Sequence, residues 1–87
     1  MEARFTVYTK PFCGPCNRAK ALLTALALPF KEIAIPETDD QARSELFARS
    51  GLRTFPQIFF DGRLIGGFHD LRALEEGGGI KNHFGLD

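Results

Sequence analysis

The apolar residues change their spacing along the first third of the chain, and this change limits the folds that are open to it. Residues 4–9 are rich in aromatic and β-branched side chains, which is typical of a β-strand. From Cys16 the apolar residues follow helical spacing, and Pro29 marks the expected end of that helix. A second strand is predicted from Phe30 to Ile35. A helix that connects two strands forms a βαβ unit, in which the strands are parallel.

The following segments predict a second helix, a β-hairpin and a third helix. Thr38 and Gln41 have the spacing of a capping box at a helix start, and Gly51 is the expected left-handed terminator. Asp61-Gly62, between two apolar runs, predicts a type I′ hairpin turn. Asp70 is then expected to cap a short last helix. The predicted order is βαβαββα, which is an α/β fold.

Length and charge narrow the possible classes of function. The 87 residues fit one domain, residues 1–87, and 11 basic residues balance 11 acidic ones. This balance argues against binding to nucleic acid or to a membrane surface, because both need a basic patch. The first five residues lack the basic start of a signal peptide, and two cysteines are too few for a secreted disulfide framework. We therefore expect a cytoplasmic protein, and no apolar stripe on the predicted helices requires a partner, so we expect a monomer.

The strongest functional signal is the segment Cys13-Gly-Pro-Cys16, which lies between the first predicted strand and the first predicted helix. A thiolate at a helix N-terminus faces unpaired backbone N–H groups and the positive end of the helix dipole. At such sites the pKa of cysteine falls from about 8.5 into a range of about 3.5–7.5. Lys10 adds positive potential nearby. We therefore expect Cys13 to be the nucleophile, and Cys16, one turn further into the helix, to be the resolving thiol.

Other interpretations of the two cysteines remain open. A structural disulfide would close so small a loop that it constrains the unfolded chain little, and a reducing cytosol would break it. A zinc site needs a second pair of ligands, and His69 and His83 are too far apart in sequence for the usual histidine pair. Two inert buried cysteines are typical of a helix interior rather than of a turn that contains Gly14 and Pro15. Redox chemistry without a bound metal is therefore favoured.

Two further segments have the features of a ligand site. Thr54-Phe55-Pro56 precedes the hairpin, where the local sequence favours a trans proline, whereas a cis bond would turn the Phe55 backbone outward. Gly66 and Gly67 precede the last helix, where glycine lets a ligand approach the backbone and the helix start attracts a carboxylate. An ordinary loop that ends in the Asp70 cap explains the same residues.

Together these motifs resemble those of glutaredoxins, over nearly the whole chain. The matching segments are Lys10–Cys16, Arg53–Phe60 and Gly66–Leu71. Each is modest alone, but the three in this order are specific to the family. The resemblance implies a thioredoxin-like fold, with a four-stranded mixed sheet flanked by three helices. It also implies a cis Pro56 beside the two cysteines, against the local expectation.

The resemblance further implies a groove for glutathione beside the cysteines. Cys13 would hold the glutathionyl sulfur, the Phe55 backbone would pair with the cysteinyl part, and residues 68–70 would bind the γ-glutamyl end. Lys10 and Arg43 would hold the glycyl carboxylate, although Arg43 is equally explained as a solvated charge on the second helix. The residues of the implied glutathione site are Lys10, Phe12, Arg43, Thr54, Phe55, Pro56, Gly67, Phe68, His69 and Asp70.

The chain departs from the family pattern at several of these positions. Gly14-Pro15 is the dipeptide typical of thioredoxins, where glutaredoxins commonly have Pro-Tyr, so an aromatic contact to glutathione is lost or is supplied by Phe12. Phe55 stands where valine is usual, and Phe68-His69 where small or acidic residues are common. These departures bear on the reduction potential and on the affinity for glutathione more than on the type of reaction.

We therefore predict an enzyme, a glutathione-dependent thiol–disulfide oxidoreductase that reduces protein disulfides and glutathione mixed disulfides. Glutathione would be its co-substrate, no cofactor would be tightly bound, and disulfide-containing or glutathionylated proteins would be its partners. Gly14-Pro15 supports an alternative in which thioredoxin reductase reduces the protein. A third hypothesis is a dimer that bridges a [2Fe–2S] cluster through Cys13 and glutathione, for which Gly14 is the supporting residue.

Overall fold

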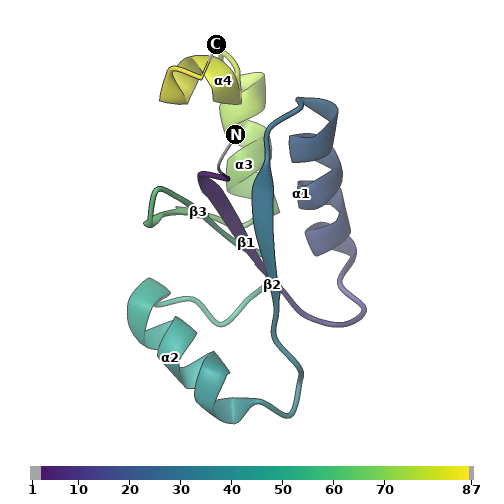
Figure 1. Ribbon diagram of the computed structural model, residues 1–87, viewed down its shortest axis with the longest axis vertical. Coiled ribbons are helices and arrows are strands. Elements are labelled where there is room, and N and C mark those ends of the chain that lie inside the picture. The colour runs from purple at the N-terminus through teal and green to yellow at the C-terminus, as the bar shows by residue number, and fades with distance from the viewer. Residues whose placement is uncertain (1–2, 87) are drawn as a thin grey trace.

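A mixed β-sheet organises the chain, and the computed structural model describes residues 3–86 of it (Figure 1). The elements in chain order are β1 (Phe5–Thr9), α1 (Gly14–Ala25), β2 (Phe30–Ala34), α2 (Asp40–Ser50), β3 (Gln57–Phe60), β4 (Arg63–Gly66), α3 (Phe68–Glu76) and α4 (Ile80–Phe84). The four strands lie in the order β2-β1-β3-β4. β1 pairs parallel with β2 and antiparallel with β3, and β3 pairs antiparallel with β4. The predicted βαβ unit, hairpin and mixed four-stranded sheet are confirmed.

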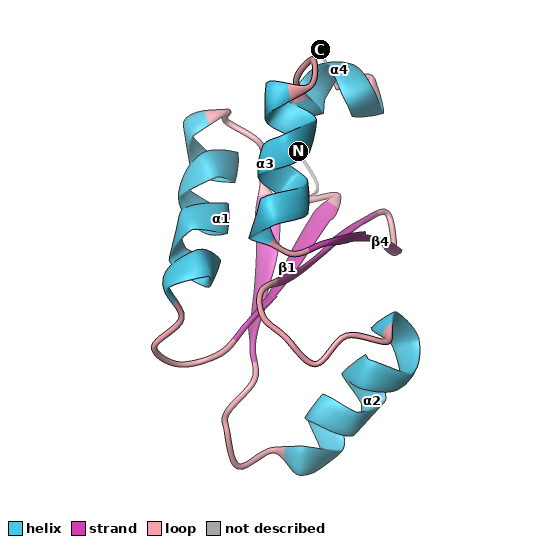
Figure 2. Ribbon diagram, turned by 180° about the vertical axis from the view of Figure 1, so that it is seen from behind, coloured by secondary structure: helices cyan, strands magenta, loops and turns pink. Residues whose placement is uncertain are grey.

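Helices cover both faces of this sheet because side chains alternate along each strand. Figure 2 shows α1 and α3 beside each other and α2 apart from them. Val7 and Ile58 point toward α1 and α3 and pack with Leu23 and Leu71 in the larger apolar cluster. The smaller cluster lies under α2 and contains Leu46, Ile35 and Phe59. Each side chain that is fully buried in this way contributes about 1.5–3 kcal/mol. The two clusters hold the three helices around the end of β1 where the cysteines lie.

Two predicted helix caps are wrong. Asp39, not Thr38, caps α2, because its carboxylate accepts a hydrogen bond from the backbone N–H of Ala42 at 3.0 Å. Gly67, not Asp70, is the N-cap of α3. Asp70 instead occupies the third helical position and accepts the backbone N–H of Gly67 at 2.9 Å. In both cases an acidic side chain accepts a backbone N–H group that is free at the helix start, Asp39 as the N-cap itself and Asp70 from the third helical position.

The first and last helices also differ from the prediction. Pro29 does not end α1, which stops at Ala25. The backbone N–H of Leu28 bonds to the Leu23 carbonyl and Ala27 has φ 57°, so the helix ends in a Schellman motif that directs Leu28 into the core. The short helix α4 follows the glycine segment and is a fourth helix where three were expected; it buries Ile80 against the larger cluster.

The turns are formed as the sequence predicts. Gly51 ends α2 with φ 72°. Asp61 and Gly62, with φ 49° and 81°, supply the two positive backbone angles that a type I′ hairpin turn requires. Among the described residues, no helix has both the length and the apolar composition needed to span a bilayer.

Candidate active site

The two cysteines lie at the start of α1, after the loop that follows β1, and they form a disulfide. Their Cα atoms are 5.2 Å apart. Cys13 is the N-cap of α1 with extended backbone angles, and its Sγ accepts the backbone N–H of Cys16 at 3.1 Å. The following Pro15 favours this helix start, because proline is already fixed in the helical φ range and needs no N–H partner there. The predicted placement of a sulfur at the positive end of a helix is confirmed.

The two sulfurs differ in accessibility. Cys13 retains 7% exposure, whereas Cys16 retains 1% and lies inside the first turn of α1. A substrate that approaches from solvent therefore meets Cys13 first. This difference supports different roles for the two thiols, although both residues are largely buried in the disulfide state.

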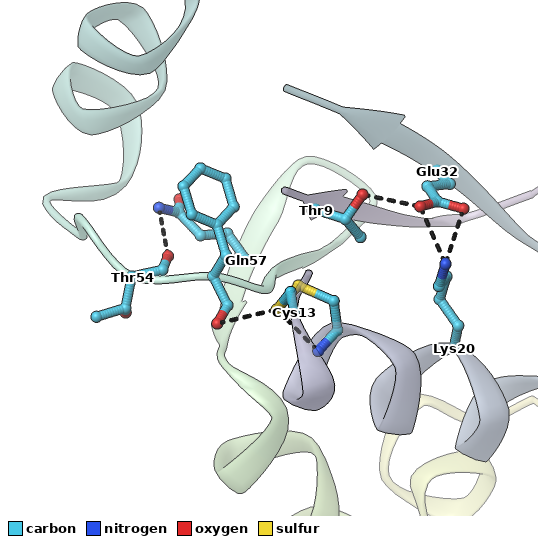
Figure 3. The surroundings of a disulfide bond; sticks show 8 residues. Thr9, Cys13, Lys20, Glu32, Thr54 and Gln57 are labelled. Atoms are coloured by element: carbon cyan, nitrogen blue, oxygen red, sulfur yellow. Dashed lines mark hydrogen bonds and ion pairs between the residues drawn. A yellow bond between two sulfur atoms is a disulfide. The ribbon is translucent and has the colours of Figure 1, made fainter. Parts of the chain in front are cut away.

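A polar cluster anchors the end of β1, from which the cysteine turn departs (Figure 3). The buried Thr9 hydroxyl donates to the Glu32 carboxylate on β2 at 2.8 Å, and Lys20 on α1 contacts the same carboxylate at 3.1 Å. The Thr9 hydrogen bond and the Lys20 ammonium lower the pKa of Glu32, and partial burial opposes them. The cluster ties β1, β2 and α1 together directly behind the two cysteines.

The segment before β3 lies against the disulfide. The Phe55–Pro56 peptide bond is cis, as the family resemblance implied and the local sequence did not. The Phe55 carbonyl oxygen lies 3.9 Å from the Cys13 sulfur. Within the described part of the chain, no backbone group pairs with the Phe55 N–H. An extended peptide can therefore add to the Phe55 backbone immediately beside Cys13.

Gln57 shapes this segment, and the sequence analysis did not single it out. Its side chain is 1% exposed, and its amide NH₂ donates to the backbone carbonyl of Leu52 at 2.9 Å. It also donates to the backbone carbonyl of Thr54 at 3.1 Å (Figure 3). The Oε1 atom is buried and unpaired among the described residues. The sequence feature that could have drawn attention to Gln57 is its position as the polar first residue of an apolar strand that begins after Pro56.

The start of α3 forms the other wall of the site. Gly66 has φ 133°, and a side chain there would collide with the Asp70 carboxylate. Only glycine therefore lets the chain pass this close to Asp70. The carboxylate of Asp70 is held by the Gly67 N–H, and His69 is exposed with its Nδ1 3.3 Å from the Arg72 guanidinium. The helix start and one carboxylate thus face the same space.

Two adjacent hollows flank the Phe55 segment. The first, of about 580 Å³, is lined by Pro15, Arg18, Leu52, Thr54, Phe55, Pro56, Gly67, Phe68, His69, Asp70 and Arg72. The second, of about 520 Å³, is lined by Asp40, Arg43, Ser44, Leu46, Phe47, Leu52, Arg53, Phe55 and Gln57. They share Leu52 and Phe55, so together they form one groove that crosses the Phe55 backbone.

Of three further residues of the predicted site, one lines this groove and two do not. Arg43 lines the second hollow with its guanidinium 5.4 Å from the centre of the Phe55 ring, and its Nε is buried without a partner among the described residues. Lys10 is exposed and lines neither hollow. Phe12 also lines neither hollow; its side chain is fully exposed, and its backbone has φ 55°. Residues 3–86 contain no cluster of three or more histidine, cysteine, aspartate or glutamate residues that could hold a metal ion.

Comparisons with known proteins agree with this geometry. The family model Glutaredoxin matches residues 5–65. The chain is 45% identical to Glutaredoxin 3 of Escherichia coli K12 over 78 residues, which cover 90% of this chain and 93% of the relative. It is similar in structure to a crystallised buckwheat glutaredoxin–glutathione complex, with a TM-score of 0.82, 27% identity and coverage of 91% and 74% of the two chains. The solution structure of a Brucella melitensis glutaredoxin matches with a TM-score of 0.77, 42% identity and coverage of 97% and 88%.

Proposed function

The chain belongs to the glutaredoxin family and is a thiol–disulfide oxidoreductase that uses glutathione, and we propose that Cys13 is its nucleophile and Cys16 its resolving thiol. The observation that carries this assignment is the disulfide at the start of α1, which lies beside a groove open to an extended peptide. The more accessible sulfur, Cys13, is the one at the N-cap.

The structure of the helix start supports a Cys13 thiolate in the reduced protein. The Cys16 N–H already points at the Cys13 sulfur, and a hydrogen bond of this kind strengthens when its acceptor is charged. The first turn of α1 has no acidic residue to oppose the negative charge. The helix dipole adds about 0.3–1 kcal/mol in favour of an anion at this end.

With a glutathione mixed disulfide, we propose that the Cys13 thiolate attacks the sulfur of the glutathione moiety. The bond to the substrate sulfur breaks, the substrate leaves as a thiolate, and glutathione becomes bound to Cys13. A second glutathione, as its thiolate, then attacks this mixed disulfide and leaves as oxidised glutathione, which restores the Cys13 thiolate. Cys16 takes no part in this cycle.

With a protein disulfide, Cys13 attacks one substrate sulfur and the other leaves as a thiolate. Cys16 then attacks the Cys13 sulfur of the mixed disulfide, which releases the second substrate thiol and forms the Cys13–Cys16 disulfide. This product is the state that the structure contains. Two glutathione molecules return it to the dithiol.

We propose that glutathione lies across the Phe55 backbone, with one end in each hollow. Its γ-glutamyl end would meet the start of α3, where the backbone of residues 68 and 69 and the Asp70 carboxylate are available. Its glycyl carboxylate would meet Arg43 in the second hollow, and we propose the exposed Lys10 as a second cation for the same carboxylate. An extended tripeptide is about 10 Å long, which suits a groove that spans both hollows.

Three other residues complete this proposed site, and one is left out of it. Thr54, Pro56 and Gly67 line the first hollow around the proposed position of the tripeptide. Phe12 is exposed and lines neither hollow, so we do not include it among the glutathione contacts. Such a site works where glutathione is reduced and abundant, so we propose that the protein acts in a reducing compartment such as the cytoplasm. We also propose that residues 1–87 form one domain.

Exchange of each cysteine for serine tests the assignment of roles. We expect Cys13→Ser to abolish the reduction of both substrate classes. We expect Cys16→Ser to abolish the reduction of a protein disulfide and to retain the turnover of a glutathione mixed disulfide. Loss of mixed-disulfide turnover in Cys16→Ser alone would show that the nucleophile is assigned wrongly.

The dipeptide Gly14-Pro15 favours a second reductant, thioredoxin reductase. The oxidised protein is incubated separately with glutathione and with thioredoxin reductase plus NADPH, and the free thiols are counted. We expect glutathione to reduce it faster, because the start of α3 in the first hollow and Arg43 in the second suit the two ends of the tripeptide, and a reductase would use neither. Reduction by the reductase alone would favour the second candidate.

A further inference from the structure

The Phe68 ring carries two arginines at the edge of the first hollow. Arg18 comes from α1 and Arg72 from α3, and the guanidinium carbon of each lies 5.7 Å from the centre of the ring. Arg18 folds back along α1, so that its Nη1 lies 3.5 Å from the position that a Cβ on Gly14 would occupy. Two positive charges are thus held beside the turn that contains the cysteines.

Neither arginine is neutralised by an acid. The ion pairs of the described residues join Arg4 to Asp61 and Lys20 to Glu32, on other parts of the surface. Among the residues that the structure describes, Asp70 is the one acid that lines this hollow, and its carboxylate is held by the Gly67 N–H. A cation over an aromatic ring is attracted to the face of the ring without losing its charge. Phe68 therefore concentrates positive charge here and leaves it available to an anion.

The proposed glutathione site does not need these two arginines. Its γ-glutamyl end is matched by the start of α3, and its glycyl end by Arg43. Arg18 and Arg72 line the first hollow but are exposed to solvent. On the loop before Cys13, Phe12 also presents a fully exposed ring, held by a backbone with positive φ, which is unfavourable for a residue other than glycine. Both features suit a substrate larger than a tripeptide.

We propose that Arg18 and Arg72 bind an acidic side chain next to the reactive cysteine of a protein disulfide substrate. In the mixed disulfide with Cys13, the partner's chain occupies the groove, and its carboxylate accepts hydrogen bonds from the two guanidinium groups on Phe68. The protein thereby selects disulfides in acidic surroundings. This inference rests on the proposed function, because it concerns the step in which Cys13 is bonded to a protein.

Short peptides with one internal disulfide test the preference directly. Two peptides are compared that differ only in carrying glutamate or lysine beside the same cysteine, and their kcat/KM is measured with glutathione, glutathione reductase and NADPH. Charges at the rim of an interface typically change the association rate, so we expect the glutamate peptide to be favoured about five- to tenfold at low salt. The preference should shrink as salt screens the charges. Equal rates for the two peptides would overturn the proposal.

A double variant and a charge-matched control locate the effect. We expect Arg18→Gln with Arg72→Gln to lower kcat/KM for the glutamate peptide to that of the lysine peptide, a larger loss than the one it causes on the mixed disulfide of glutathione and mercaptoethanol. The control, Arg63→Gln with Lys81→Gln, removes two charges from β4 and α4, outside both hollows, and should keep the preference.

The remaining outcomes contradict the proposal in distinguishable ways. Loss of the preference in the control variant would assign it to overall charge. An equal loss of activity on the glutathione mixed disulfide in the double variant would assign the two arginines to the glutathione site. If the wild type turned over neither peptide nor mixed disulfide, the proposed function itself would be wrong.

Discussion

Exchange of Gln57 for methionine tests how the chain holds the segment that faces Cys13. The Gln57 amide is the side-chain donor to two backbone carbonyls of the loop before the cis proline, those of Leu52 and Thr54. Methionine has a similar length and volume but donates no hydrogen bond. The variant therefore removes both contacts and leaves the packing of the buried side chain nearly unchanged.

The expected cost follows from the surroundings of each atom. Loss of two hydrogen bonds costs about 2 kcal/mol. Thr54 is exposed, so water can satisfy its carbonyl after the change, whereas Leu52 is half-buried and its carbonyl is less accessible. The change also removes the unpaired Oε1, whose burial is unfavourable by about 1 kcal/mol. We therefore expect the free energy of unfolding to fall by about 1–2 kcal/mol, which lowers the Tm by roughly 5–15 °C in a domain of this size.

The assay pairs thermal unfolding with kinetics. Unfolding is followed by circular dichroism on the oxidised protein, and Gln41→Met is the control, because Gln41 is exposed and bonds only to Glu45 on its own helix. The control should change the free energy of unfolding by less than about 0.5 kcal/mol. Since the loop presents the Phe55 backbone to glutathione, we expect Gln57→Met to raise the KM for a glutathione mixed disulfide several-fold while kcat stays within about twofold.

Two results would refute this reasoning about Gln57. If Gln57→Met were as stable as the control, the two hydrogen bonds would not hold the loop. If kcat fell and KM were unchanged, the amide would act on the chemical step rather than on the position of the Phe55 backbone.

Substitutions at Gly66 and Glu32 should also change the stability of the protein, for reasons that the structure gives. Gly66→Ala places a methyl group against the Asp70 carboxylate at a backbone angle that only glycine tolerates, so we expect a loss of about 2–3 kcal/mol in chemical denaturation and a higher KM for glutathione. The hydrogen bond from Thr9 and the contact with Lys20 lower the pKa of Glu32 in the folded protein. The ionised carboxylate therefore stabilises the folded state when the pH is above the pKa of glutamate in the unfolded chain. This stabilisation is lost as the pH falls through the lowered pKa of the folded state. Glu32→Gln should therefore cost up to about 1 kcal/mol at pH 7, and the difference from wild type should shrink as the pH falls below the lowered pKa of Glu32. A difference that does not depend on pH would contradict this expectation.

Much of the fold follows from local patterns in the sequence. The change from strand to helix spacing predicted the βαβ unit, and Asp61-Gly62 predicted the hairpin turn with both backbone angles positive. The caps were less predictable, because Asp39 stands next to Thr38 and either residue can cap the helix. The short helix α4 was missed, since only one of its residues, Ile80, is fully buried and its five residues carry almost no periodic signal.

The site depends more on contacts between distant segments. A helix-start sulfur could be predicted from Cys13 and its neighbours alone, because the field of a helix is a local property. The cis bond at Pro56 could not, since the adjacent residues favour trans and only the family resemblance indicated otherwise. The loop contacts of Gln57 depend on how the chain after α2 returns to β3, which no local pattern specifies.

Two phenylalanines at which the chain departs from the family pattern explain why the groove keeps its positive charge. Phe68 contacts Arg18, which lies 50 positions earlier in the chain, and Phe55 contacts Arg43 of α2. If acidic residues held these arginines, the positive charges would be neutralised and the groove would attract anions weakly. A ring holds a guanidinium in place and leaves its N–H groups free, so aromatic support converts ordinary surface arginines into ligands for carboxylates. The departures from the family pattern at Phe55 and Phe68 therefore hold positive charge in the groove beside Cys13.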